Sequence, residues 1–209
     1  MQVADTLREM IMTGELQEGD KINENQLCAS MGISKTPLRE ALRVLSVEGL
    51  ISLIPNRGSY VTKPTIEEIK EKFEVMTLLE SFCARATAEK IGADDLHYLE
   101  QLHATLEEKY KSKDQKEYIH TNNQYHSFIQ QLAGNRTLNQ IVNGLREKIL
   151  LYRFQSLSLP GRFDASIKEH RELLAAFREK NPQKAERIMK NHLKQQSLAV
   201  EKLVKKTQK

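Results

Sequence analysis

The chain has 209 residues, of which 39% are hydrophobic and 29% charged, and its formal net charge is +4 at pH 7. Such a chain is expected to form one or two globular domains with a buried core. With only two cysteines, Cys28 and Cys83, it does not have the composition of a disulfide scaffold, and no apolar run approaches the roughly 20 residues that cross a bilayer. We therefore expect a cytoplasmic protein without a membrane span or a signal peptide.

The first 34 residues predict two short helices joined by a turn. An apolar stripe runs from Val3 to Ile11 and stops at Gly14, a residue that commonly ends helices. Asn23 can cap a second helix, which Gly32 ends. Two helices of this length, followed closely by a third, are typical of a helix-turn-helix.

A third helix is predicted over residues 34–45. Thr36 is a suitable N-cap, and Pro37 then stands at the first helical position, where its missing N–H costs nothing. One face is apolar at helical spacing and is expected to pack on a core; it comprises Leu38, Ala41, Leu42 and Leu45. Another face is basic every fourth residue; it comprises Lys35, Arg39 and Arg43. Guanidinium groups one turn apart can meet phosphates or guanine edges, although a solvated charged face is the alternative.

The positive charge of this region is local. Residues 1–34 hold two basic and six acidic side chains, a net charge of −4, whereas residues 35–63 hold five basic and two acidic ones, a net charge of +3. The change of sign falls at the start of the third helix. Such a concentrated footprint favours a polyanionic partner.

A β-hairpin is predicted after the third helix. Apolar residues from Leu50 to Ile54 lead into a turn from Pro55 to Gly58, and the extended pattern then resumes. As a wing beside a helix-turn-helix, the hairpin would bring Arg57 to the DNA backbone or minor groove; alternatively, these residues only make the turn. Three helices and a hairpin make a winged helix-turn-helix.

Three segments of this region occur in the order and spacing of one known family: GELQEGDKI, ENQLCASMGISKTPLREALRVLSVEGLI and PNRGSYV. Residues 3–62 closely resemble the DNA-binding domain of GntR-family transcription regulators. The resemblance implies that DNA is contacted by the start and outer face of the third helix and by the wing tip, through Ser34, Lys35, Thr36, Arg39, Arg43, Arg57 and Gly58. Lys35 stands where the family often has arginine, which favours a phosphate contact because lysine cannot make the same forked contact.

The remainder of the chain has helical periodicity nearly throughout. Thr65 and Glu68 form a capping-box pattern before the first of these helices. Six helices are predicted, over residues 66–91, 94–113, 114–133, 137–157, 163–180 and 181–206. The fold class is therefore mostly α, with a winged helix-turn-helix domain over residues 1–63 and an all-α antiparallel bundle over residues 64–209.

Four polar residues in these helices are candidate metal ligands. Asn122 and His126 are four residues apart and share a helical face, while His170 and His192 lie in two later helices. A single histidine is more often an ordinary surface or core residue than a ligand, and the residues alone do not indicate that these converge.

Three further segments occur in the order and spacing of a known domain: NNQYHSFIQQLAGN, EHRELLAAF and AERIMKNHL. With them, residues 66–205 resemble the FCD ligand-binding domain of the FadR-type branch of the same family. The resemblance strengthens the case for these four residues as metal ligands. Many FCD domains hold a divalent metal through an aspartate and three histidines. The resemblance maps this site onto Asn122, His126, His170 and His192, with Asn122 in place of the aspartate. Three imidazoles suit Zn²⁺, with Ni²⁺ or Mn²⁺ as alternatives, and the neutral amide is expected to weaken the site or to leave a ligand position to a carboxylate of an effector.

A second departure from the FCD pattern concerns the binding of an acidic effector. Met76 stands where family members commonly have an arginine that reaches the ligand. Arg153, and after it Arg146, remain as candidates for holding a small, anionic effector, for which a carboxylate is expected; the alternative for Arg153 is a surface position.

The leading hypothesis is a metabolite-responsive transcription regulator, a repressor that binds a palindromic DNA operator as a homodimer. A rival hypothesis is a metalloenzyme that uses the three histidines, with Glu169 as a possible base. A third is a DNA-binding module whose helical half only dimerises.

Overall fold

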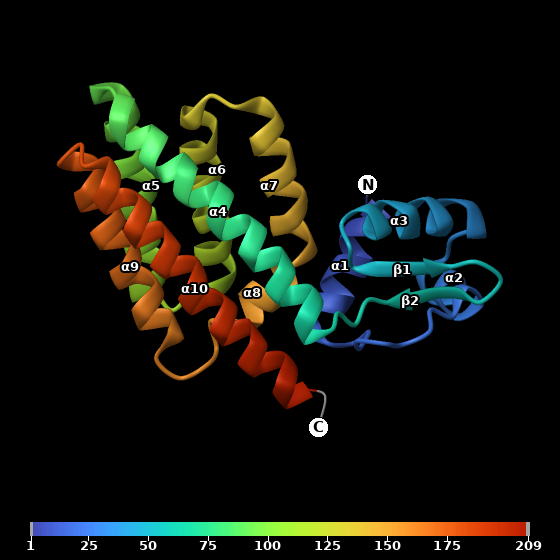
Figure 1. Cartoon of the computed structure of the whole chain (residues 1–209). Coiled ribbons are helices and arrows are strands. Elements are labelled where there is room, and N and C mark those ends of the chain that lie inside the picture. The colour runs from blue at the N-terminus through green and yellow to red at the C-terminus, as the bar shows by residue number, and fades with distance from the viewer. Residues whose placement is uncertain (1, 208–209) are drawn as a thin grey trace. The chain divides into compact units, whose positions relative to one another are not determined.

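The structure is a computed structural model that describes residues 2–207, with the side chains of residues 206 and 207 left out. The chain divides into two compact units, residues 1–64 and residues 65–209. Within the described residues, the first unit consists of three helices and a hairpin and the second unit of helices only. Figure 1 shows their order along the chain.

The first unit is built on α1 (Gln2–Thr13), α2 (Glu24–Met31) and α3 (Lys35–Val47). The predicted apolar stripe of α3 is confirmed, since Leu38, Ala41, Leu42 and Leu45 are all buried. The N-cap lies two residues earlier than predicted: it is Ser34, in extended conformation, and not Thr36, which puts Pro37 in the first turn. A proline is tolerated there because the first-turn N–H groups have no partner within the helix.

The hairpin follows as β1 (Ile51–Ile54) and β2 (Gly58–Val61), an antiparallel pair in which Ile54 is opposite Gly58. Gly58 has a φ of +101°, which glycine adopts at little cost, and the preceding Asn56 has a φ of +61°. Together with the three helices, this hairpin confirms the predicted winged helix-turn-helix.

The second unit has seven helices within the described residues, where six were predicted. They are α4 (Ile66–Lys90), α5 (Ala93–Lys111), α6 (Gln115–Ala133), α7 (Arg136–Lys148), α8 (Leu150–Ser156), α9 (Arg162–Arg178) and α10 (Pro182–Thr207). The capping box of Thr65 and Glu68 is present at the start of α4. Helix α10 packs along α4, while α5 packs on α6 and α9, around an apolar core that contains Phe73, Leu99 and Phe177 (Figure 1).

The additional helix arises from a break at Ile149, which has φ −117° and ψ 8°. The sequence predicted one helix over residues 137–157. Around the break Ile149, Leu151, Tyr152 and Arg153 are all buried, which is more than one stripe of a straight surface helix can cover. The chain therefore turns at Ile149, so that α8 enters the core.

Within residues 2–207, no helix is long and apolar enough to span a membrane. Both thiols, those of Cys28 and Cys83, are free.

Candidate metal centre and DNA-binding face

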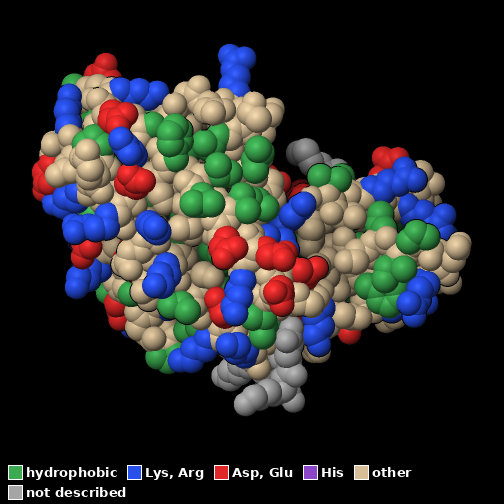
Figure 2. Space-filling model, in the orientation of Figure 1, with side chains coloured by type: hydrophobic (Ala, Val, Ile, Leu, Met, Phe, Trp, Pro, Cys, Tyr) green, Lys and Arg blue, Asp and Glu red, His purple; other side chains and the backbone are tan. Residues whose placement is uncertain are grey.

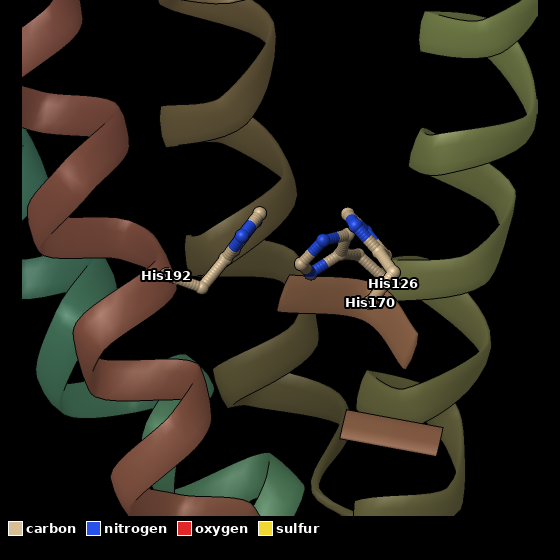
Figure 3. A group of neighbouring side chains, drawn as sticks. All are labelled: His126, His170 and His192. Atoms are coloured by element: carbon tan, nitrogen blue, oxygen red, sulfur yellow. The ribbon is translucent and has the colours of Figure 1, made fainter. Parts of the chain in front are cut away.

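Three histidines from separate helices meet inside the second unit. His126 lies on α6, His170 on α9 and His192 on α10, and each is at most 2% exposed. One ring nitrogen of each lies within 4.8 Å of those of the other two. Figure 3 shows the rings of His126 and His170 close together, with that of His192 turned toward them. The helical bundle thus brings together residues that are up to 66 positions apart.

The outer nitrogen of each ring has an acceptor that fixes its tautomer. The Nδ1–H groups of His126 and His192 donate to the carboxylates of Glu80 and Glu169, at 3.1 and 2.6 Å. That of His170 donates to the carbonyl oxygen of Ser166, one turn earlier on α9, at 2.8 Å. Since all three partners only accept hydrogen bonds, the proton of each neutral ring is on Nδ1 and the lone pair is on Nε2.

All three Nε2 atoms are buried without a hydrogen-bond partner. Burial lowers the pKa of each ring, that of His126 to about 3, so the rings are neutral near pH 7. Buried lone pairs without a donor are costly, whereas a cation at their centre would satisfy all three at once. In zinc and similar metal sites, a ligand imidazole typically donates its second N–H to a carboxylate or a carbonyl oxygen, as these three rings do.

Asn122, the fourth predicted ligand, lies one turn before His126 on α6 and is 2% exposed. Its amide oxygen could complete a metal shell but brings no negative charge. Within the described residues, the group of possible ligands contains only the three histidines and no carboxylate. The donor set therefore fits a divalent ion that nitrogen ligands prefer, and it leaves positions for further oxygen ligands.

Two carboxylates connect the histidines to arginines. Glu80 accepts two hydrogen bonds from Arg146 Nη1, at 2.6 and 2.8 Å, in addition to the one from His126. Burial by itself would raise the pKa of Glu80, but the charge of Arg146 and the hydrogen bond of His126 outweigh it and lower that pKa. Glu169 is shared in the same way between His192 and Arg162, whose guanidinium lies 2.9 Å from both carboxylate oxygens.

Arg153 lies in the core rather than on the surface, with an exposed fraction of 0%. Its Nε donates to Oε1 of Gln196 at 3.0 Å and its Nη1 to Oδ1 of Asn123 at 2.9 Å, while its Nη2 is buried without a partner. Arg146 also reaches Asn123, at 3.3 Å, but is already paired with Glu80. Met76, which stands where the FCD pattern has an arginine, is buried in the core, one turn before Glu80 on α4.

In the first unit, the residues predicted to contact DNA are exposed. They are Ser34, Lys35, Thr36, Arg39, Arg43, Arg57 and Gly58. Arg39 donates from Nε to the carboxylate of Glu24 on α2 at 2.9 Å, and 61% of its side chain is exposed. Glu24 thus holds one edge of the guanidinium and leaves the Nη groups for another partner.

Sequence reasoning missed five residues of the metal centre: Glu80, Asn123, Arg162, Ser166 and Gln196. Helical spacing held a partial signal, because Ser166 precedes His170 by four positions and Gln196 follows His192 by four. Glu169 was considered as a catalytic base, but the structure engages it with His192 and Arg162. No spacing in the sequence indicated that Glu80 lies against α6 and α7.

Two family models match the chain. The FCD domain model matches residues 71–195, and the model of bacterial regulatory proteins of the gntR family matches residues 1–61. The chain is a GntR-family regulator with an FCD domain. This GntR-family regulator is accordingly a DNA-binding transcriptional regulator, and its relatives are regulators rather than enzymes.

Curated relatives of this GntR-family regulator cover most of its length. It is 26% identical over 193 residues to the uncharacterized HTH-type transcriptional regulator YdhC of Bacillus subtilis. The match covers 92% of this chain and 86% of the relative. It is 29% identical over 178 residues to the gluconate operon transcriptional repressor of Bacillus licheniformis, which covers 83% and 70%.

Among solved structures, the fold is similar to that of a putative GntR transcriptional regulator from Rhodococcus sp. RHA1. The TM-score is 0.76 and the sequence identity 22%, with 95% of each chain covered. At this identity the likeness concerns the fold alone.

Proposed function

We propose that this protein is a cytoplasmic repressor that binds a palindromic operator as a homodimer and responds to a small carboxylate held beside a divalent metal ion, Zn²⁺ being our first choice. The observation that carries the sensor role is the set of three buried Nε2 lone pairs without partners, close to the buried and unneutralised Arg153. The same chain carries a winged helix-turn-helix. A repressor role is supported by the gluconate operon repressor among its relatives.

The DNA contacts that we propose follow from the exposed face of α3. Ser34, Lys35 and Thr36 begin the helix, where unpaired N–H groups favour phosphate. Arg39 and Arg43 lie one and two turns further on, and we assign them to base edges and phosphates of the major groove. Arg57 and Gly58 would meet the backbone or minor groove from the wing.

Of the two candidate arginines for the effector, we favour Arg153. Arg146 is already paired with Glu80, which leaves it little free charge. Arg153 has only amide partners, at Gln196 and Asn123, and keeps an unpartnered Nη2. A carboxylate that bridges this Nη2 and a metal ion held by the histidines would neutralise both. Its binding would alter DNA affinity to the extent that it prefers one arrangement of the dimer.

For the dimer, we propose a face of the second unit formed by α4 and α10. The exposed side of α4 carries Val75, Leu78 and Phe82 at helical spacing, with exposed fractions of 43%, 71% and 51%, and Leu198 of α10 is 50% exposed. Figure 2 shows hydrophobic side chains gathered over the middle of α4. Exposed apolar clusters of this kind favour a protein partner.

A second copy of this chain is the partner that suits the face. A groove of about 580 Å³ lies beside the stripe, between α4 and α10. Its lining includes charges of both signs, as a surface that pairs with itself requires: Lys70, Glu74, Lys190, Lys194 and Glu201. Mixed charges allow lysines of one copy to meet glutamates of the other.

Leu78→Glu combined with Phe82→Glu should therefore convert the protein to a monomer, because two carboxylates per copy would be buried against one another. Sedimentation velocity of the full chain measures this. Val47→Glu, at a residue 77% exposed on α3 of the first unit, is the control and should remain dimeric. A double variant that sediments as the wild type does would remove this face from the proposal.

The experiment that tests the function as a whole is to sequence the chromosomal DNA that the protein binds in its own cell. We expect a small set of sites with two-fold symmetric sequence, beside genes whose products act on one class of carboxylate. A mobility shift with such a site should then change when that carboxylate and Zn²⁺ are added. Binding that is strong but unaffected by any acid from those genes would support a module that only dimerises.

A further inference from the structure

We propose that the metal ion and an organic carboxylate bind this bundle cooperatively, each raising the affinity of the other, because Arg153 is a buried cation without a carboxylate partner and Asn122 supplies the metal with no charge. The inference rests on the proposed function and specifies how its sensor site is regulated.

The charges around the histidines do not balance. Two carboxylates, Glu80 and Glu169, are each paired with one arginine, Arg146 and Arg162, in addition to a histidine. Arg153 is the fifth ionic side chain of this group, and the hydrogen-bond acceptors that it has are the amides Gln196 and Asn123. These five groups therefore carry a net charge of +1, and an unpaired buried charge is costly.

Arg153 is close enough to act on the metal centre. Gln196, which accepts from its Nε, is one turn beyond His192 on α10. Asn123, which accepts from its Nη1, directly follows Asn122 on α6. The charge of Arg153 also contributes to lowering the pKa values of Glu80 and of His192. The guanidinium is thus held by the same helical turns that present the predicted ligands.

A divalent ion at the three Nε2 atoms would raise the local excess from +1 to +3, since the imidazoles and Asn122 are neutral. An ion alone is repelled by Arg153, and a carboxylate alone has a single cation to meet. Together, the carboxylate lies between two positive centres and removes their repulsion. Coupling of this kind is reciprocal, so the factor by which the anion tightens zinc is the factor by which zinc tightens the anion.

The test measures the zinc affinity of the full-length protein by competition with a chromogenic chelator. The titration is done without addition, with acetate or succinate, and with the neutral acetamide or succinamide, after correction for zinc bound by the anions themselves. We expect at least one anion to tighten zinc tenfold or more and the amides to leave it unchanged. Equal zinc affinity with and without both anions would overturn the coupling while leaving the metal site in place.

Two variants assign the coupling to its residues. In Arg153→Met, zinc should bind more tightly without an anion, because the repelling charge is gone, and the anions should no longer change its affinity. Asn122→Asp should also tighten zinc without an anion and reduce the coupling severalfold, since the new carboxylate takes the place of the added one. Coupling that persists in both variants would overturn the assignment.

The outcomes separate this inference from the function on which it rests. Zinc that binds neither alone nor with an anion would refute the metal centre of the proposed function and the coupling together. Zinc that binds without coupling refutes only the inference. Operator binding, measured separately by mobility shift, is unaffected by either result.

Discussion

Replacing Arg39 and Arg43 together with alanine should weaken operator binding at least about 30-fold, because each arginine contact to base edges contributes about 1–3 kcal/mol. Both side chains are exposed on α3, and their loss leaves the buried stripe from Leu38 to Leu45 untouched. Glu24 holds Nε of Arg39, so the guanidinium is oriented before DNA arrives and less side-chain freedom is lost on binding. Mobility shifts with the identified operator measure the effect.

The control removes the same charge from the second unit. Arg171→Ala with Arg178→Ala also lowers the net charge from +4 to +2, at exposed positions of α9 outside the proposed dimer face, and should change operator affinity only slightly at physiological salt. If an arginine of α3 contacts phosphate, its replacement should also reduce the steepness of log K plotted against the logarithm of the salt concentration, by about one unit of slope. Operator binding by the Arg39 and Arg43 variant that matches the control would exclude α3 as the recognition face.

His126→Ala should lower zinc affinity at least about 100-fold, because it removes one of three nitrogen ligands, a larger loss than the 10–100-fold typical of a residue that only supports a ligand. The readout is the metal retained after dialysis, together with the melting temperature. At a zinc concentration of 100 times Kd, the wild type should gain about 2.7 kcal/mol, a rise of roughly 5–10 °C for a chain of this size. The variant should lose that rise.

His120 offers a matched control on the same helix. It is exposed on α6, where its ring pairs with Gln124, and His120→Ala should keep both the retained zinc and the rise in melting temperature. Comparison of the metal-free proteins separates a loss of zinc binding from a loss of folding. A His126→Ala protein that holds zinc as tightly as the His120→Ala protein would dismiss the three-histidine centre.

Local patterns predicted most of the fold. The stripe of α3, the hairpin around Pro55 and the capping box at Thr65 each depend on residues close in sequence, and all three are present. The break at Ile149 was not predicted, because the helical period continues through it and only the packing of α8 into the core interrupts the helix. The N-cap of α3 is Ser34 instead of the predicted Thr36, and the sequence could not decide between them because both are good capping residues.

The metal centre was predictable in part. The FCD resemblance indicated His126, His170 and His192, whereas their convergence follows from how α6, α9 and α10 pack. The pairing of Glu80 with Arg146 joins residues 66 positions apart and has no periodicity that a sequence could display. For Arg153 the sequence left an effector-binding role and a surface position as alternatives, because an arginine in a helix is usually exposed. Its burial excludes the surface position, and its amide partners are visible only in the fold.

The three facing Nε2 lone pairs also bear on how long the protein survives in the cell. Each buried acceptor without a partner costs about 1–3 kcal/mol, against a total stability of about 5–15 kcal/mol for a typical domain. A metal-free copy therefore opens more often, and opened copies are what proteases degrade. For the repressor that we propose, metal starvation would therefore relieve a promoter through faster turnover of the protein, even in a cell where the amount of the proposed effector has not changed.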